Sequence, residues 1–413
     1  MTQDIQQIIL QAEQDLKTVF AGFDRVEQVG TDRVLNAFSK RRVAARHFAP
    51  STGYGYDDVG RDTLEALCAD IFLAEAAICR PALASGTHTL SVGLFGLLLP
   101  GDELLLATGS PYDTLEGVIG KHREPGSLSE LGVTAKTVEL TQEGGIDVPA
   151  VLDAMTDKTR VVFLQRSRGY SLRPSLFPKD MAEVIRAVKR KNPEVFVYVD
   201  NCYGAFVTED EPTFYGADLV AGSLIKNLGG GLAPTGGYLA GSLQAIKRVE
   251  HRLTAPGIGR EVGSYEASYR PFYQGLFMAP HTVCQALKTA ALSARVAELL
   301  GMTATPAAFE PRSDIIQALV MGDANKVVAY CQGIQAASPV DSFATPEPWA
   351  MPGYADPVIM AAGAFVQGAS IELSCDAPMR APFAVYQQGA LTYASGRRAV
   401  AAAFERLLEV SDA

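Results

Sequence analysis

VFVYVDN, at residues 195–201, is a run of β-branched and aromatic residues that ends in the acidic side chain of Asp200. Such a run is typical of a buried strand, because these residue types pack well on a pleated surface. A second run, LVAGSLIKNLGGG at residues 219–231, passes from a strand pattern into Ser223, Lys226 and three glycines. In open α/β sheets the carboxyl ends of the strands face the ligand crevice. These runs predict Asp200 at such a crevice and Lys226 where a glycine-rich backbone can approach a ligand closely.

The surrounding sequence continues this pattern of strand followed by helix. Between about residues 80 and 240, short apolar runs are separated by amphipathic stretches such as KDMAEVIRAVKRKN at residues 179–192. Alternating strands and helices favour a mainly parallel sheet with helices on both faces, so the predicted fold class is α/β. Three more runs with strand character are ELLLATG at 103–109, RVVFLQRS at 160–167 and GGYLAG at 236–241.

The chain has 413 residues, more than one ordinary core supports, so its length predicts at least two domains. A strong helical pattern at residues 281–300 marks the change of region. Beyond it, residues 361–376 are the expected strand content and residues 397–408 the expected helix. The predicted parts are an N-terminal helical segment at 1–50, a large α/β domain at 51–290 and a smaller C-terminal α+β domain at 291–413.

Composition and charge exclude several classes of protein. The net charge of −10 and the pI near 5.1 argue against a nucleic-acid partner, because phosphate binding needs clustered Lys and Arg. The six cysteines show no close repeated spacing, so neither a disulfide scaffold nor a zinc cluster is indicated. The N-terminus lacks a signal-peptide pattern, and the longest apolar run, residues 92–99, is about half of the ~20 residues that cross a bilayer. We expect a soluble cytoplasmic protein with no membrane partner.

Two further segments carry candidate binding groups. Ser85, Gly86 and Thr87 stand directly before an apolar helical stretch, where free N–H groups and the positive end of the helix dipole can bind a phosphate. A capped helix without a ligand is the alternative. Tyr112 lies just beyond a strand pattern and faces the same crevice, unless it is a buried structural tyrosine. A lysine taken alone is far more often a solvated surface charge, but the small apolar neighbours and the glycine run around Lys226 favour a site.

Together these segments supply a phosphate cradle, an aromatic ring, a carboxylate and an amine, in that order along one α/β domain. Pyridoxal 5′-phosphate (PLP) needs these four: an anchored phosphate, a stacked ring, a carboxylate on the pyridine nitrogen and an amine for the aldehyde. The sequence therefore predicts PLP as the cofactor and an amino acid as the small-molecule substrate.

The sequence also resembles the fold-type-I PLP enzymes of cysteine and methionine metabolism, and more closely the bacterial branch described as methionine gamma-lyase-like or aluminium-resistance proteins. The resemblance runs from about residue 30 to residue 400. It implies a carbon–sulfur lyase that releases a thiol, a 2-oxo acid and ammonia from a sulfur-containing amino acid. The segments that carry it are RPALASGTHTLSVGLFGLLLPGDELL (80–105), GSPYDTLEGVIG (109–120), LQRSRGYSLRPSL (164–176), VDNCYGAFVTEDEP (199–212), AGSLIKNLGGGLAPTGGYLAG (221–241) and ELSCDAPMRAPFAVYQQGALTY (372–393).

The resemblance implies a role for each residue of the predicted PLP site. Lys226 would carry the cofactor as a Schiff base and move the substrate α-proton. Asp200 would pair with the pyridine nitrogen, and Tyr112 would stack on the ring and assist departure of the leaving group. The expected phosphate ligands are Ser85, Gly86, Thr87 and Ser223.

Related enzymes complete the phosphate site with residues of a neighbouring subunit. Tyr54, Tyr56 and Arg61 lie in the corresponding region of this sequence, so the resemblance implies a homodimer or homotetramer with shared active sites. The helical segment at residues 1–50 is expected to pack on that partner subunit.

Several residues are candidates for holding the substrate. Arg380, in APMRAP, is the expected clamp for the substrate carboxylate, because a guanidinium bonds a carboxylate with two N–H groups; a surface salt bridge is the alternative. Arg166, Arg168 and Tyr170 are expected to line the pocket. These three lie in FLQRSRGY, residues 163–170, where better-known family members carry a Pro-flanked asparagine. The contact to the ring's phenolic oxygen must therefore be made differently.

Other functions compete with this interpretation. Ser223 and Lys226 fit the S-x-x-K motif of penicillin-recognising hydrolases, but the S-D-N and K-T-G elements are absent. Neither a dinucleotide fingerprint nor a P-loop occurs, and the five histidines form no HExxH zinc motif. Within the PLP fold, an aminotransferase-like or desulfurase-like enzyme, or a non-catalytic role in stress resistance, stays open. A desulfurase needs a mobile reactive cysteine, and Cys375 beside Asp376 is its one candidate, which we expect to be structural.

Overall fold

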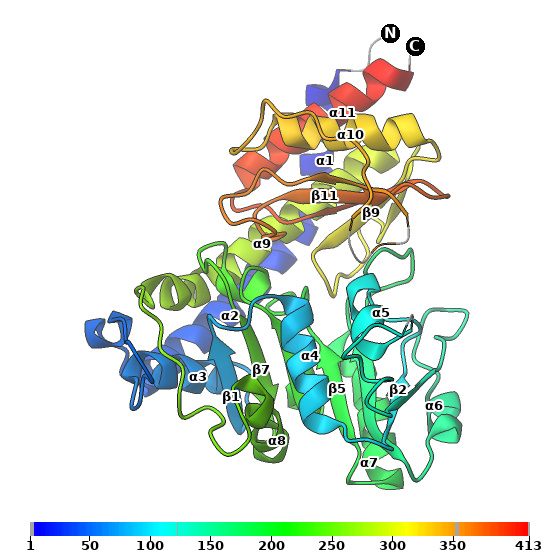
Figure 1. Ribbon diagram of the computed structural model, residues 1–413. Helices are drawn as coiled ribbons and strands as arrows, with labels where there is room; N and C mark the ends of the chain where they lie inside the picture. The colour runs from blue at the N-terminus through cyan, green and yellow to red at the C-terminus, as the bar shows by residue number, and fades with distance from the viewer. Residues whose placement is uncertain (1–3, 122, 352–353, 355, 412–413) are drawn as a thin grey trace.

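The computed structural model describes residues 4–121, 123–351, 354 and 356–411; His122, one of the five histidines, lies outside the described residues. The chain forms a large, mainly parallel sheet and a separate, smaller antiparallel sheet, each with its own helices (Figure 1). This arrangement confirms the predicted α/β class with a smaller α+β part. Among the described residues, no helix combines the length and the apolar character that crossing a bilayer requires.

The large sheet has the strand order β1-β7-β6-β5-β4-β2-β3. Strands β6, β5, β4, β2 and β3 run parallel, and β7 is antiparallel to both of its neighbours. All five strands predicted from apolar runs are present. Strand β5 is central, and its last residue, Asp200, lies level with Gln165 at the end of β4. The bounds are β1 Ala76–Arg80, β2 Glu103–Leu106, β3 Thr134–Thr137, β4 Thr159–Gln165, β5 Phe196–Asp200, β6 Leu219–Ser223 and β7 Gly237–Gly241.

Successive side chains of β5 enter two different cores, as the two-residue period of a strand requires. Val197 and Val199 pack in the core that α2, α3, α7 and α9 cover, whereas Phe196 and Tyr198 pack in the core under α4, α5 and α8. Helices therefore cover both faces of the sheet. Their bounds are α2 Lys17–Lys40, α3 Val59–Ile71, α4 Gly86–Leu97, α5 Asp113–Ile119, α6 Val148–Ala154, α7 Pro178–Lys191, α8 Leu243–Leu253 and α9 Arg270–Leu299, with short 3-10 turns at η1 Ala45–Phe48, η2 Pro212–Tyr215 and η3 Asn227–Gly229.

The small sheet has the order β10-β11-β12-β9-β8, with all neighbours antiparallel. The strand content expected at residues 361–376 is only partly correct, because residues 362–373 form an irregular segment between β10 and β11. The helix expected at 397–408 is present but begins earlier, at Tyr393. The elements are β8 Thr303–Thr305, β9 Ile316–Val320, α10 Ala324–Ala336, β10 Val358–Ala361, β11 Ser374–Pro378, β12 Ala384–Gln388 and α11 Tyr393–Ser411.

Helix α9 links the two parts: its residues up to Leu287 pack in the large core, and those from Ala291 pack in the small one. The first helix, α1 (Ile5–Asp15), lies beside α11 near both termini (Figure 1). Its buried face, which includes Ile5 and Ile9, belongs to the small core of the same chain. The apolar side of α1 is thus buried within its own subunit. Packing of this segment on a partner subunit stays a prediction, and it would use the exposed side of the helix.

The three glycines after Lys226 pack against α9. A Cβ at Gly230 would lie 2.3 Å from the carbonyl oxygen of Gly275, and one at Gly275 would lie 2.2 Å from the carbonyl oxygen of Gly229. Gly230 also has a positive φ of 57°, which favours glycine. The glycine run therefore lets the chain that follows Lys226 touch the backbone of α9, whereas we had expected it to approach a ligand.

Gly275→Ala is expected to displace this loop and with it Lys226. The added methyl group must move backbone atoms, so we expect a loss of about 1–3 kcal/mol in stability and weaker cofactor binding. Gly22→Ala on α2 is the matched control, because a Cβ there meets nothing within 4 Å. That control should stabilise the protein by about 0.5–1 kcal/mol. Thermal unfolding and cofactor titration of both variants check this, and equal behaviour of the two would contradict it.

Candidate active site

A cavity of about 270 Å³ lies at the carboxyl ends of β5 and β6, between the large and small sheets. The large domain contributes the predicted PLP site, and the small domain contributes residues of β10, β11 and the segment between them. The described residues that line the cavity include Ser85, Gly86, Thr87, Tyr112, Tyr170, Asp200, Tyr203, Ser223, Lys226, Tyr354 and Asp376. A wider cleft of about 950 Å³ adjoins it and shares Tyr112, Tyr170 and Tyr354.

Lys226 follows β6 and extends its amine into this cavity. The Nζ atom lies 3.7 Å from the centre of the Tyr203 ring, a cation–π contact. Burial alone would lower the pKa of the Lys226 amine, but the neighbouring Tyr203 and Cys202 side chains outweigh burial, and the net shift is upward. The amine is thus held at the inner wall of the cavity rather than in bulk water.

Asp200 ends β5 with its carboxyl group buried at the same wall. Its Oδ1 atom accepts a hydrogen bond of 3.0 Å from the backbone N–H of Cys202. Burial raises the pKa of the Asp200 carboxyl, although Cys202 and, more weakly, Lys226 oppose the shift. A cationic partner, such as a protonated ring nitrogen, would stabilise the charged form of this buried carboxyl group.

The N-terminus of α4 forms the floor of the cavity. The Ser85 Oγ caps the helix by accepting from His88 N at 3.0 Å, and Thr87 Oγ1 lies 2.7 Å from Thr114 Oγ1. A Cβ at Gly86 would lie 3.1 Å from Cys202 Sγ, so this glycine lets the helix end approach the end of β5. First-turn N–H groups have no partner inside their helix, which leaves them available for an anion.

Tyr112 lies between the cavity and the adjoining cleft. Its backbone N–H donates to Gln165 Oε1 at 2.7 Å, and its hydroxyl lies 2.9 Å from that of Tyr354. The Tyr112 and Tyr170 rings are 5.5 Å apart between centres. Burial raises the pKa of the Tyr112 phenol well above its ordinary value. Gln165 ends β4 level with Asp200, and its Nε2 also donates to the backbone oxygen of Ser167 at 3.1 Å.

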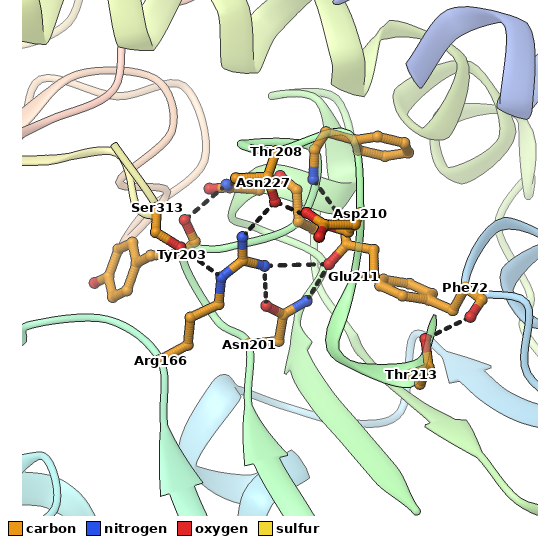
Figure 2. A network of polar contacts seen from close by, with 12 residues as sticks. Phe72, Arg166, Asn201, Tyr203, Thr208, Asp210, Glu211, Thr213, Asn227 and Ser313 are labelled. Carbon is orange, nitrogen blue, oxygen red and sulfur yellow. Dashed lines mark hydrogen bonds and ion pairs between the residues drawn. The ribbon is translucent and has the colours of Figure 1, made fainter. Parts of the chain in front are cut away.

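Arg166 does not line the pocket, contrary to expectation. Its side chain is fully buried and sits at the centre of a polar network (Figure 2). The guanidinium donates to Ser313 Oγ at 3.1 Å, Asn201 Oδ1 at 2.8 Å, Thr208 Oγ1 at 2.8 Å and Glu211 Oε2 at 3.2 Å. Because Ser313 precedes β9, this network ties the small domain to the carboxyl ends of β4 and β5.

The two arginines proposed for substrate binding line the adjoining cleft rather than the inner cavity. Arg168 is buried and donates to the backbone oxygen of Thr305 at 2.8 Å, next to Asp314. Arg380 pairs with Asp356 at 2.9 Å, and its side chain is 44% exposed. The salt bridge considered as the alternative for Arg380 is therefore present.

The residues expected to reach a partner subunit lie outside the cavity of their own chain. Tyr54 and Tyr56 are 71% and 65% exposed and stack on each other. Arg61 is buried instead, and its guanidinium donates to Asp62 Oδ1 at 2.8 Å and to the carbonyl of Gly55 at 2.7 Å. The two tyrosines are thus available to a second subunit, whereas the Arg61 guanidinium is occupied within its own chain. Their role in a shared site stays a prediction.

Four residues of this region did not emerge from the sequence. Tyr203 lies three positions after Asp200, a spacing that could have indicated it. Tyr354 and Asp376 are distant in sequence and arrive with the small domain, so no local signal marks them. Arg173 lines the cleft and donates to the carbonyl oxygens of the β4 end, and burial lowers its pKa to about 10.

The cysteine considered for a desulfurase does not face the cavity. Cys375 is fully buried in the small core, with its Sγ 3.9 Å from that of Cys331. Its neighbour Asp376 points the opposite way, into the cavity, as alternation along β11 requires. Cys375 is therefore structural, as expected.

The donor set of the cavity fits PLP. The Lys226 amine, the Asp200 carboxyl group and the N-terminus of α4 surround one cavity, and Tyr112 supplies an aromatic ring at its edge. Gly86, at that helix N-terminus, lets the helix lie close to Cys202. The architecture is that of the fold-type-I PLP-dependent class. The solved structure of YhfS from Escherichia coli, described as pyridoxal-5′-phosphate dependent, shares the fold with a TM-score of 0.62 and 18% identity over 94% of this chain and 97% of that chain.

Within that class, the sequence profile of the methionine gamma-lyase family matches residues 5–408, and the chain belongs to this family. The Bacillus subtilis protein YnbB is 49% identical over 402 residues, which cover 97% of this chain and 96% of YnbB. A solved Listeria monocytogenes structure, provisionally described as a cystathionine beta-lyase involved in aluminium resistance, has 47% identity and a TM-score of 0.95 over 97% of this chain and 100% of that chain. A Clostridium novyi structure described as a carbon-sulfur lyase involved in aluminium resistance has 44% identity and a TM-score of 0.94 over 97% and 95%. This is a carbon–sulfur-lyase-like family.

Proposed function

We propose that this protein is a PLP-dependent carbon–sulfur lyase that releases a thiol, a 2-oxo acid and ammonia from a sulfur-containing amino acid. The observation that carries the proposal is the meeting of the Lys226 amine and the buried Asp200 carboxyl in one cavity above the α4 N-terminus. The descriptions of two solved relatives, one provisionally as a cystathionine beta-lyase and one as a carbon-sulfur lyase, support the same proposal.

Lys226 is the group that moves protons. When bound, PLP supplies an aldehyde that joins an amine and a ring that withdraws electrons from the substrate α-carbon. Lys226 Nζ would hold that aldehyde, and as the amine at the inner wall of the cavity it would also take the α-proton of the substrate. The Tyr203 ring beneath Nζ at 3.7 Å limits the directions in which this amine can move.

Asp200 and the α4 N-terminus orient the cofactor between them. Asp200 would accept a hydrogen bond from the protonated ring nitrogen, and the N–H groups of Gly86 and Thr87, with the Ser223 hydroxyl, would bind the phosphate. Tyr112 would stack on the ring and assist departure of the leaving group. The positions of these side chains around the cavity support the assignments.

The proposal is tested by incubating the cofactor-loaded protein with cystathionine, methionine, homocysteine and cysteine in turn. We expect release of a thiol and a 2-oxo acid in equal amounts from at least one of them. Transfer of the amino group to an added 2-oxo acid, with no thiol released from any substrate, would instead identify an aminotransferase. Cofactor binding without either reaction would favour a non-catalytic role.

Asp200→Ala is expected to retain the cofactor and its visible absorbance but to lose about 10²–10³-fold in turnover, because the ring nitrogen loses the charge that keeps it protonated. Asp153→Ala, an exposed carboxylate on α6, is the control and should behave as the wild type. Steady-state thiol release by both variants provides the measurement. Full activity of Asp200→Ala would remove this residue from the site.

A further inference from the structure

Asp376 is a carboxyl group of the small domain that the mechanism above does not use. It lies on β11 and lines the cavity that holds Lys226, although its neighbours Cys375 and Ala377 pack in the small core. Its Oδ2 atom accepts hydrogen bonds from Tyr170 Oη at 3.3 Å and from Gln388 Nε2 at 2.8 Å. Across the described chain, no Lys, Arg or His nitrogen forms an ion pair with it.

A carboxyl group in this setting exchanges its proton near neutral pH. Burial raises the pKa of Asp376 to about 7, against the opposing effects of Tyr170, Lys226 and Gln388. The titratable groups that face it are Tyr170 from the segment after β4, Lys226 from the segment after β6, Tyr354 from the segment before β10, and its strand neighbour Cys375. Asp376 is therefore protonated below about pH 7 and charged above it.

Tyrosine hydroxyls connect Asp376 to the expected position of the leaving group. Tyr170 Oη lies 3.3 Å from Asp376 Oδ2; the phenol donates when Asp376 is charged, and a protonated Asp376 donates to the phenol instead. The Tyr170 side chain also hydrogen-bonds that of Tyr112, and its ring lies 5.5 Å from Tyr112 and 6.0 Å from Tyr354 between centres. The Tyr112 and Tyr354 hydroxyls are 2.9 Å apart. Burial raises the pKa values of both Tyr112 and Tyr170 well above the ordinary value, so neither phenol gives up a proton readily unless another acid replaces it.

We propose that Asp376 holds the proton that neutralises the departing sulfur, and that Tyr170 and Tyr112 pass this proton on. The inference rests on the proposed lyase function. The carbon–sulfur bond breaks with both electrons on sulfur, sulfur takes the Tyr112 proton, Tyr112 takes that of Tyr170, and Tyr170 takes that of Asp376. Asp376 is left as a carboxylate and regains a proton from water in the adjoining cleft, so no oxidant or reductant is needed.

A proton donor of this kind is not interchangeable with Lys226. Lys226 already carries the α-proton when the sulfur leaves, and it lies on the large domain. Asp376 arrives from the small domain, so the two protons required for one elimination are handled by separate groups. Asp376 thus acts through the two tyrosines, as a positioning and proton-supplying residue that itself need not touch the substrate.

Asp376→Asn tests the inference, because asparagine keeps the shape of the side chain but has no acidic proton. Two substrates are compared: a thioether amino acid, whose thiolate needs a proton, and β-chloroalanine, whose chloride does not. We expect kcat for the thioether to fall about 10²-fold or more, with β-chloroalanine turnover close to wild type. Cys375→Ala, on the opposite face of β11, is the control and should leave the ratio of the two rates unchanged.

An infrared titration gives a readout that does not depend on turnover. The cofactor-loaded wild type is expected to show a protonated-carboxyl band that disappears with a midpoint near pH 7 and is absent from Asp376→Asn. Equal losses on both substrates, or a carboxyl band that Asp376→Asn retains, would overturn the inference. If Asp376→Asn does not bind cofactor, the pH dependence of wild-type turnover on the two substrates is compared instead. Turnover of the thioether should fall as pH rises through about 7, whereas turnover of β-chloroalanine should not, and equal pH dependence would overturn the inference. The two proposals can fail separately. If the wild type releases thiol from no substrate, the lyase function is wrong, whereas the infrared band reports only the protonation of Asp376.

Discussion

Lys226→Ala is expected to lose the visible absorbance of the bound cofactor and to lower thiol release by at least about 10³-fold. The variant removes both the amine that holds the aldehyde and the base that takes the α-proton, and no other described lysine lines the cavity. Lys247→Ala, an exposed lysine on α8, is the control for general effects of removing a lysine. Absorbance spectra and thiol assays of both purified variants provide the measurement.

A second substitution separates the positive charge of Lys226 from its chemistry as an amine. Lys226→Arg keeps a positive charge in the cavity, but a guanidinium neither joins an aldehyde nor accepts a proton near neutral pH. We expect it to resemble Lys226→Ala in activity while retaining more of the cofactor through the phosphate contacts. Wild-type absorbance and turnover in either variant would contradict the assignment.

Arg166→Met is expected to cost about 3–5 kcal/mol of stability, because it leaves the buried Glu211 carboxylate without its cation. Glu211 is 1% exposed, and Asn201 bonds both charged groups: its Nδ2 donates to Glu211 Oε2 at 3.1 Å, and its Oδ1 accepts from Arg166 Nη1 at 2.8 Å (Figure 2). Burial lowers the pKa of Arg166 and raises that of Glu211, so each charge depends on the other.

The effect should appear as a large drop in the unfolding midpoint and as weaker coupling of the two domains. Arg406→Met is the matched control, since its pair with Glu409 on α11 is more than half exposed and such pairs contribute at most about 1 kcal/mol. Denaturant unfolding of both variants, each loaded with cofactor, gives the comparison. Similar midpoints for the two would mean that the network in Figure 2 does not stabilise the fold.

The large sheet could be predicted from the sequence because its central strands are buried on both faces and therefore read as unbroken apolar runs. The same runs mark where each strand ends, which is why Asp200 and Lys226 emerged together. Strand β3 escaped prediction, because TAKT is exposed at the edge of the sheet and has no apolar run. Strand β1 was missed too: it has only five residues, AAICR, with Pro81 directly after it.

The rest of the site could not be predicted from short stretches of sequence. Asp376 lies 150 positions after Lys226 and reaches the cavity only because β11 turns alternate residues to opposite sides of the small sheet. The prediction that Arg166 lines the pocket is wrong for a related reason. QRSRGY contains two charged side chains near a strand end, which favours a substrate role, but the polar partners of the buried Arg166 come from residues 201–211 and from Ser313. The sequence of residues 165–170 alone does not indicate partners that lie so far away along the chain.

Everything proposed for this protein depends on a covalent link between the cofactor and one amine. Borohydride reduction of the cofactor-loaded protein, followed by proteolysis and mass spectrometry, locates that amine directly. We predict that the reduced cofactor is recovered on the peptide that contains Lys226 and on no other lysine. Recovery on a different residue, or of unmodified Lys226 after complete reduction, would contradict the account.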